Sequence, residues 1–363
     1  MFYRLATDGT EQQIPLMDAY AGPRRTGCWI IGGGPSLGAL PVDAIVRSTL
    51  PKFAINLAGH RLLRPTFWTA YDPTQRFQRS TYLDPSVLKF VPRGRAMDLV
   101  PGSSFKVCDC PQTVFFDRDP QVGFHNFLSR PMGAPTTVKP REGITDWQDS
   151  LIQAIHIACL LGFRTLYLAG CEMFVAPASS WQDAAQSQGV KYTPREPLKD
   201  YHQRCLSAGV PLSIYDHPQS TRQYHFDEAK SLAAALQTDQ HYYRVAQYLR
   251  LARRAMGLAG MELISVTPGS RLNDFFPYRS VEAVCQQITI EVGQPQHEPT
   301  RGLYTESAHR IPAELVTMRD YRPHHWGKEP PSSQRPPEMP TTRPVPLAQQ
   351  PPREIPVSIQ EVG

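Results

Sequence analysis

The sequence contains no apolar run that approaches the roughly 20 residues a helix needs to cross a bilayer. Its first eight residues also lack the apolar core of a secretory signal peptide. The seven cysteines are an odd, scattered set without a second pair at zinc spacing, and no two histidines form an H-x-x-x-H pattern. Although the net charge is +5, no dense run of lysine and arginine occurs, so anionic small molecules suit the chain better than nucleic acid. These absences predict a cytoplasmic protein in a reducing compartment, with no membrane span, zinc site or nucleic-acid partner.

Two common nucleotide-binding motifs are also missing. No G-K-[ST] tripeptide occurs, which excludes a Walker A loop. Leu37 stands where the third glycine of a G-x-G-x-x-G fingerprint belongs. The second expected strand ends on Asn56 instead of the acidic residue that holds a ribose in NAD enzymes. The chain is therefore expected to belong to neither class.

A glycine-rich turn is the most informative stretch that is present. Four apolar residues from Cys28 onward have the length of a buried strand, and three consecutive glycines follow them directly. Glycine permits close approach of a ligand to the backbone, and Pro35 suits the first turn of a helix, whose free N–H groups attract phosphate. The pattern predicts a nucleotide site at this turn, with a plain tight turn as the alternative. The residues expected to bind the nucleotide here are Gly32, Gly33, Gly34 and Ser36.

Apolar segments alternate with amphipathic ones along most of the chain, which predicts an α/β, Rossmann-like fold with a mostly parallel sheet and helices on both faces. The expected strands are 28–31, 52–56, 66–72, 87–91, 164–169 and 261–266, and the expected helices are 39–48, 145–162, 227–237 and 242–256. Residues 281–292 are expected to close the domain. Thr145 and Gln148 have the spacing of a capping box. Polar residues that end parallel strands gather at one edge of the sheet, where ligands bind.

Composition divides the chain into four parts. These are an N-terminal extension at 1–26, a Rossmann-like nucleotide-binding, transferase-like domain at 27–292, an irregular extension at 293–329 and a tail at 330–363. Within the domain, 92–142 is expected to be irregular and 173–226 to form a lid or insertion. Residues 330–356 hold ten prolines among 27 positions, which predicts disorder with polyproline II character. Such a tail can recruit a protein partner through an aromatic groove.

Four blocks of sequence occur in an informative order. They are residues 30–37 (IIGGGPSL), 54–56 (AIN), 162–172 (GFRTLYLAGCE) and 265–270 (SVTPGS). In this order the chain resembles the superfamily that joins the hydroxymethylpterin diphosphokinase-like (MptE-like) domain with the family 42 bacterial sialyltransferases. The resemblance covers roughly residues 27–290 in block order. It implies a Rossmann-like domain that uses an activated donor.

The resemblance also implies roles for individual residues. In the sialyltransferases the glycine turn and the asparagine after the second strand hold a cytidine nucleotide, a role that falls here to Gly33, Gly34, Ser36 and Asn56. A histidine ahead of the last long helix is their general base, and His241 occupies the matching place. Where relatives carry Ser-Gly before the central helix and Asp after the next strand, this chain has Thr145-Asp146 or Asp149-Ser150, and Glu172.

The candidate polar residues also have ordinary structural interpretations. Asp72 could bind Mg²⁺ or hydrogen-bond a ribose hydroxyl; alternatively, it is a turn residue before Pro73. Glu172 either hydrogen-bonds a sugar or acceptor, or pairs with an arginine. His241 either takes a proton from an acceptor hydroxyl, or is a surface histidine. The same ambiguity applies to His202, His217 and His225, and to Lys139 and Arg141 as phosphate contacts.

Three functions remain open at this point. The leading one is metal-independent glycosyl transfer from a nucleotide sugar to an unknown acceptor, with His241 and Glu172 as catalytic residues and with the turn, Asn56, Asp72 and Thr145 binding the nucleotide. The second is pyrophosphoryl transfer from ATP, with Mg²⁺ as a possible cofactor on Asp72. The third is an inactive nucleotide-binding module that recruits a protein partner through its proline-rich tail.

Overall fold

The computed structural model describes residues 2–6, 8–21, 26–119, 143–215 and 231–293. The chain divides into two units, Met1–Glu298 and Pro299–Gly363, and the second lies outside the described residues. The proline-rich tail expected at 330–363 therefore lies there too. The candidate contacts Lys139, Arg141, His217 and His225 likewise fall outside the described residues.

A nine-stranded, mostly parallel sheet forms the centre of the first unit, in the order β11-β10-β3-β4-β5-β6-β7-β1-β2. Its strands are β1 Tyr3–Leu5, β2 Glu11–Gln13, β3 Gly27–Ile31, β4 Lys52–Ile55, β5 Phe67–Thr69, β6 Leu88–Pro92, β7 Thr113–Phe116, β10 Thr165–Ala169 and β11 Glu262–Ser265. The strands from β11 to β7 run parallel, whereas β1 pairs antiparallel with both β7 and β2. Two short strands, β8 Arg118–Asp119 and β9 Ile144–Thr145, form a separate parallel pair.

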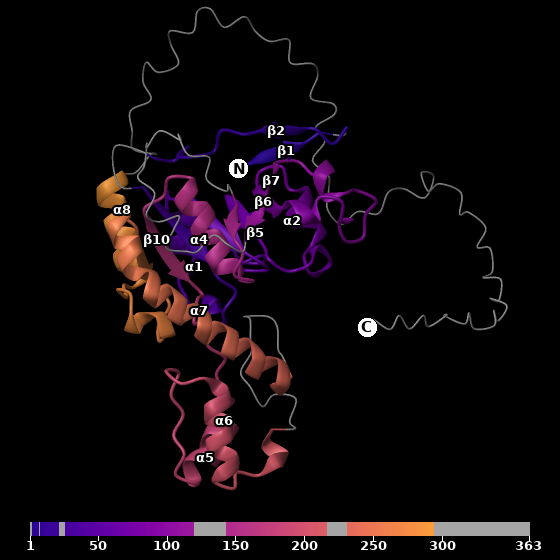
Figure 1. The fold of residues 1–363 in the computed structure, drawn as a ribbon. Coiled ribbons are helices and arrows are strands. Elements are labelled where there is room, and N and C mark those ends of the chain that lie inside the picture. Colours follow the sequence, from indigo (N-terminus) through magenta and orange to yellow (C-terminus); the bar gives the residue numbers. More distant parts are fainter. Residues whose placement is uncertain (1, 7, 22–25, 120–142, 216–230, 294–363) are drawn as a thin grey trace, which may run out of the picture. The chain divides into compact units, whose positions relative to one another are not determined.

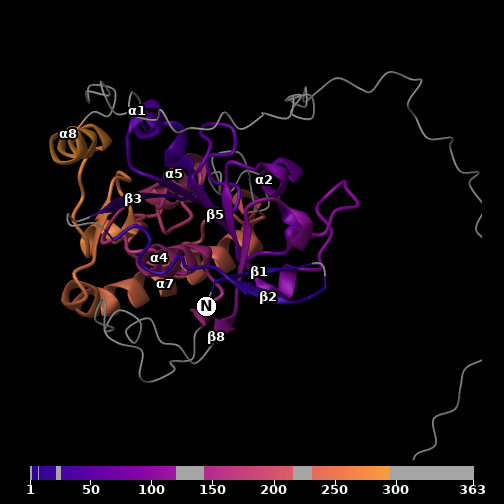
Figure 2. The ribbon, with the colours of Figure 1, turned by 90° about the horizontal axis from the view of Figure 1, so that it is seen from above.

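Helices cover both faces of this sheet, as a Rossmann-like fold requires (Figure 1). The helices are α1 Val42–Arg47, α2 Arg79–Leu83, α4 Ser150–Leu160, α5 Ser179–Ser187, α6 Leu198–Ser207, α7 Leu232–Leu258 and α8 Val281–Val292. Short 3-10 helices are η1 Pro35–Gly38, η2 Thr74–Arg76, η3 Arg93–Arg95, η4 Val107–Asp109, η5 Leu212–Ile214 and η6 Arg271–Asp274. Figure 2 shows α4 and α7 on one side of the sheet and α1 and α8 on the other. The predicted fold class is confirmed.

The strand order reverses between β3 and β10. From β3 the chain continues through β4, β5, β6 and β7 on one side, and β10 and β11 are added later on the other side. The register pairs Ile31 with Ala169, so the two chains leave the sheet side by side at Gly32 and Gly170. In open parallel sheets, ligands bind in the crevice outside the carboxyl ends of the strands at such a reversal.

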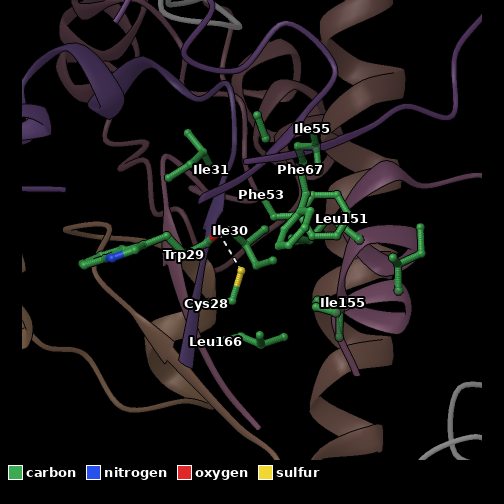
Figure 3. Close-up of a cluster of buried hydrophobic side chains, with 14 of the residues drawn as sticks. Cys28, Trp29, Ile30, Ile31, Phe53, Ile55, Phe67, Leu151, Ile155 and Leu166 are labelled. Atoms are coloured by element: carbon green, nitrogen blue, oxygen red, sulfur yellow. Dashed lines mark hydrogen bonds between the residues drawn. The ribbon is translucent and has the colours of Figure 1, made fainter. Parts of the chain in front are cut away.

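The main core lies between this sheet and its helices. All five residues of β3 are buried, because both faces of the strand are covered. Figure 3 shows Cys28 and Ile30 on the side of α4, near Leu151 and Ile155, whereas Trp29 points the opposite way. Burying such a side chain contributes about 1.5–3 kcal/mol, so truncation in this layer destabilises the frame that holds the strand ends.

A smaller second core surrounds Trp181 and Tyr201, which are both fully buried. It is built from α5, α6 and the first turns of α7, where Ala235 is buried against it. Tyr242 packs against this second core and also against the main core. Helix α7 is therefore shared between the two cores.

Two expected helices differ from the structure. The helix expected at 145–162 is α4, which begins only at Ser150, because Asp149 caps it by accepting the Ile152 N–H at 2.9 Å. Thr145 lies instead in β9. The helices expected at 227–237 and 242–256 are one continuous helix, α7, since buried Asp239 is satisfied by backbone N–H groups and does not interrupt it.

Two segments expected outside the sheet contribute strands to it. Residues 3–13, within the expected N-terminal extension, form β1 and β2, and β2 is exposed along its length, so it carries no apolar pattern. The stretch 92–142, expected to be irregular, contains β7, whose four residues are all buried. Its apolar run is short and lies among prolines and charges, which hid the strand in the sequence.

Candidate functional site

A cavity of about 280 Å³ opens at the carboxyl ends of the strands, where the order reverses. It brings together seven of the residues singled out in the sequence, although they are spread over more than two hundred positions. These are Gly32, Gly33, Gly34, Asn56, Asp72, Glu172 and His241. Ser36 and Thr145 do not line it. Thr145 is buried in β9 and donates its N–H to Nδ1 of His156 at 3.0 Å.

The glycines of the turn allow two strand ends to touch. The Gly32 N–H donates to Ala169 O at 2.7 Å, and the Gly34 N–H donates to Gly170 O at 2.9 Å. A Cβ on Gly32 would overlap Gly170 O and lie 2.7 Å from Cys171 Sγ. Gly170 itself has φ of 65°, a conformation that favours glycine. Close packing across the strand reversal therefore accounts for glycine at 32 and 170.

The Glu172 carboxylate fills the remaining space in the turn. Its Oε1 accepts the Ser36 N–H at 2.6 Å, and a Cβ on Gly34 would overlap the carboxylate. This is the backbone N–H at which the sequence predicts a nucleotide phosphate. In the structure an anion of the chain itself occupies that place, so the turn is an internal carboxylate site.

The late Thr-Pro-Gly-Ser block holds the loop that carries Glu172. The Cys171 N–H donates to Thr267 Oγ1 at 3.0 Å, and Ser270 Oγ donates to Cys171 O at 2.7 Å. The Arg271 N–H then donates to Glu172 O at 2.9 Å. These bonds fix the loop backbone on both sides of Glu172. The block supports the cavity from behind and is not part of its lining.

A buried ion pair supports the next residues of the same loop. Arg271 and Asp239 are 3% and 0% exposed, and their side chains lie 3.3 Å apart. Arg271 also donates to Met173 O at 2.7 Å, and Asp239 accepts the Val175 N–H at 2.9 Å. Desolvation raises the pKa of Asp239, and Arg271 opposes that rise. The pair is satisfied by backbone groups on all sides, which is the condition under which a buried ion pair is tolerated.

His241 and Asp149 form a side-chain pair in the cavity lining. His241 Nε2 lies 3.1 Å from Asp149 Oδ2, and Asp149 is 8% exposed. The other carboxylate oxygen, Oδ1, caps α4, so helix capping fixes the orientation of the carboxylate toward the histidine. A carboxylate that accepts one ring N–H leaves the other ring nitrogen as a proton acceptor. The arrangement can therefore act as a general base.

Asn56 is fixed at the end of β4 by three hydrogen bonds. Its Oδ1 accepts the Ser150 hydroxyl at 2.8 Å, and its backbone O accepts the Trp68 indole N–H at 2.8 Å. The Asn56 N–H donates to Thr69 O at 3.1 Å. Because Oδ1 is used internally, the side-chain NH₂ group is the part of Asn56 that can donate to a ligand.

Asp72 is paired with a cation at the cavity wall. Arg76 Nη1 lies 2.7 Å from Asp72 Oδ2. Among the described residues, no group of three or more His, Cys, Asp or Glu side chains is placed to hold a metal ion. The carboxylates of the lining are those of Asp72, Asp149 and Glu172, against the one arginine and His241. The lining therefore carries an excess of negative charge.

Backbone strain is concentrated around this cavity. The described non-glycine residues with positive φ are Asp18, Asn56, Gln112, Gln148 and Met173. Three of the five, Asn56, Gln148 and Met173, line the cavity. Strained conformations persist where the surrounding structure enforces them, and they cluster at functional sites. This concentration supports the cavity as the functional site of the described chain.

Gly34, Ser36 and Gly38 also match the G-x-S-x-G pattern of hydrolase nucleophiles. In those enzymes the serine lies on a strained turn beside a base. Ser36 lies instead in the 3-10 helix η1, and its φ is not among the positive values. Its Oγ is buried and makes no hydrogen bond to any described residue. This geometry does not fit a serine nucleophile.

Several lining residues were not expected in the site from the sequence, although Asp149-Ser150 was named as one possible match to the relatives' Ser-Gly. They are Ile55, Tyr71, Arg76, Gln148, Asp149, Ser150, Leu151, Gly170, Cys171, Met173, Phe174, Gln237, Thr238 and Tyr242. Of these, Asp149 had a detectable signal, because an aspartate directly before an apolar helix is a typical N-cap. His202 lies in α6 and packs edge-on against Trp181, where burial lowers its pKa. It belongs to the second core and not to the cavity.

Comparisons of the chain with protein-family models, with curated proteins and with solved structures find no match. Of the helices that the structure describes, none combines the length and the apolar character that crossing a membrane requires.

Proposed function

We propose that the protein is a transferase that moves a glycosyl group from a nucleotide sugar to a hydroxyl acceptor in the cavity at the strand reversal. The observation that carries the proposal is the His241–Asp149 pair, at 3.1 Å, in the lining of that cavity. A base oriented by a buried carboxylate is the usual way to activate a hydroxyl nucleophile. The Rossmann-like sheet and the position of the cavity on it are typical of nucleotide-using enzymes.

The proposed step uses the two ring nitrogens of His241 differently. The Nε2–H group donates a hydrogen bond to the Asp149 carboxylate and keeps its proton, so Nδ1 carries the lone pair that takes the proton of the acceptor's hydroxyl group. The acceptor oxygen forms a bond to the anomeric carbon as the bond from that carbon to the phosphate oxygen breaks. The nucleotide leaves with the bonding electrons, and the imidazolium is stabilised by the Asp149 carboxylate. Proton and charge are balanced without a metal.

Charge in the cavity favours this chemistry over pyrophosphoryl transfer from ATP. Asp72, the residue proposed to hold Mg²⁺, is already paired with Arg76 at 2.7 Å, and a metal would have to displace that arginine. A triphosphate would also meet three carboxylates across the same small space. A sugar donor with fewer phosphate charges is repelled less by this lining.

A nucleotide panel tests the proposal. We expect CMP or UDP, but not ATP, to raise the melting temperature in thermal-shift measurements, equally with and without Mg²⁺. His241→Asn should keep that shift and lose transfer of the sugar, which mass spectrometry of the products measures. Stabilisation only by ATP with Mg²⁺ would support pyrophosphoryl transfer instead. Binding without turnover by any donor would support an inactive nucleotide-binding module.

A further inference from the structure

We infer that Glu172 is a specificity residue that binds the hydroxyl groups of a ligand's sugar and excludes phosphate from the glycine turn. The inference rests on the proposed function, because it names the part of the donor or acceptor that this end of the cavity recognises. It changes the role of the turn from the phosphate-binding role expected from the sequence.

The first observation is a buried carboxylate without a counter-ion. Glu172 is 8% exposed and forms no ion pair with any described residue. Its Oε1 accepts the Ser36 N–H, whereas Oε2 accepts no hydrogen bond from the described residues. Oε2 is not among the fully buried unpartnered atoms, so it is open to the cavity that Glu172 lines. A hydroxyl group of a ligand can therefore donate to it, and a hydrogen bond to a charged acceptor is stronger than one to a neutral acceptor.

The second observation is that the carboxylate is held rigidly. The backbone O of Glu172 accepts the Arg271 N–H at 2.9 Å, and the side chain is fixed at its other end by Ser36. The following residue, Met173, has a left-handed conformation with φ of 58°, and its backbone O accepts a hydrogen bond from Arg271 at 2.7 Å. A group fixed at both ends loses little conformational freedom on binding, which is how specificity residues are built.

The other groups around the cavity suit a sugar. Side-chain amides come from Asn56, Gln148 and Gln237, and aromatic rings come from Tyr71, Phe174 and Tyr242. A few convergent polar groups among aromatic rings are typical of small-molecule sites. A carboxylate that accepts from sugar hydroxyls is the device by which many dinucleotide sites recognise ribose. Here the carboxylate comes from the strand beyond the reversal, β10, and not from the strand after the glycine turn.

The same carboxylate excludes phosphate. Oε1 already occupies the Ser36 N–H at 2.6 Å, and a phosphate at that N–H would place two anions in contact. Like charges in a poorly solvated space repel strongly. The donor's phosphate is therefore expected elsewhere along the cavity, with the sugar hydroxyls at Glu172.

Uncharged nucleosides test this inference without any transfer chemistry. The full chain would be titrated by calorimetry with cytidine, uridine, guanosine and adenosine, and with their 2′,3′-dideoxy counterparts. We expect at least one ribonucleoside to bind about tenfold more tightly than its dideoxy form, which corresponds to about 1.4 kcal/mol. Glu172→Gln should abolish this difference by weakening only the ribonucleoside, because the amide keeps the shape and loses the charge.

Two further variants make the result decisive. Glu172→Ala should give the same loss, and Glu282→Gln, on the exposed face of α8, should bind like the wild type. Equal binding of the ribose and dideoxy forms by the wild type, no binding of any nucleoside, or an unchanged preference in Glu172→Gln would each overturn the inference. Transfer can fail while the hydroxyl preference stands, because nucleosides carry no transferable group, so the two proposals are tested separately.

Discussion

Replacing Gly34 by alanine tests whether the Glu172 carboxylate occupies the glycine turn. Gly34 has φ of −66° and ψ of 157°, which alanine adopts without strain. The three nearest atoms to a new Cβ all belong to the Glu172 carboxylate, so that carboxylate must move. The Ser36 N–H then loses a charged acceptor, a loss of about 1.5–3 kcal/mol. Alanine also lowers the conformational entropy of the unfolded chain relative to glycine, which stabilises the folded state by about 0.4–1 kcal/mol.

The expected net effect is a destabilisation of about 1–2 kcal/mol in the wild-type chain. In the Glu172→Ala background the Cβ meets no carboxylate, so the same substitution should be neutral or stabilising by about 0.4–1 kcal/mol. Urea unfolding of the four proteins, followed by circular dichroism, gives this coupling as a double-mutant cycle. Gly38→Ala is the matched control, because Gly38 is the last residue of η1, the 3-10 helix that Gly34 precedes, and its Cβ would meet nothing within 4 Å.

One result would refute the reasoning. If Gly34→Ala destabilised both backgrounds equally, the carboxylate would not lie in the turn. The inference about hydroxyl recognition would then lose its geometric basis. A loss in Gly38→Ala as large as that in Gly34→Ala would instead show that η1 tolerates no added methyl group.

Three other predictions concern groups around the cavity. Arg271→Met should destabilise the chain by about 3–5 kcal/mol, because it leaves Asp239 buried and unpaired, and urea midpoints measure the loss. Asp149→Ala should lower the free energy of unfolding by about 1 kcal/mol, because the N-cap of α4 is lost. It should also abolish transfer, because His241 loses the carboxylate that orients it. Asp149→Asn can still cap the helix, so it should lose transfer with a smaller loss of stability. Burial lowers the pKa of His156 to about 3. Since the unfolded chain binds that proton below about pH 6.5, wild-type stability should fall by up to about 1.4 kcal/mol per pH unit between pH 6.5 and 3. The unfolding free energy of His156→Gln should lack this part of the pH dependence. Urea unfolding of both proteins at pH 7 and pH 5 measures it, and an equal change in unfolding free energy for the two proteins would contradict the prediction.

The fold class could be predicted because its signals are local. The apolar run from Cys28 to Ile31 gave β3, and the apolar positions of the helix after residue 145 gave α4. Strand β2 gave no signal, since its three residues are polar and exposed at the edge of the sheet. Its place depends on backbone pairing with β1, and pairing leaves no trace in side-chain pattern.

The sequence predicts which polar residues end the strands at the candidate site, but not how their side chains contact one another. Asn56, Asp72 and Glu172 were identified because polar residues ending parallel strands meet at one edge. The pairing of Asp149 with His241 joins residues 92 positions apart, and the insertion of Glu172 beside Ser36 joins residues 136 apart. Such contacts follow from how α7 and β10 pack, and no spacing in the sequence encodes them.

The continuity of α7 has a mechanical consequence. The helix has 27 residues and is about 40 Å long at 1.5 Å per residue, and it is uninterrupted between the second core and the main core. Tyr242, next to His241, touches both cores. We expect a tilt of α5 and α6 that α7 follows to change the distance between the His241 imidazole and the Asp149 carboxylate, which is 3.1 Å in the structure. We therefore expect a molecule bound to the surface of α5 or α6 to act on His241 without entering the cavity.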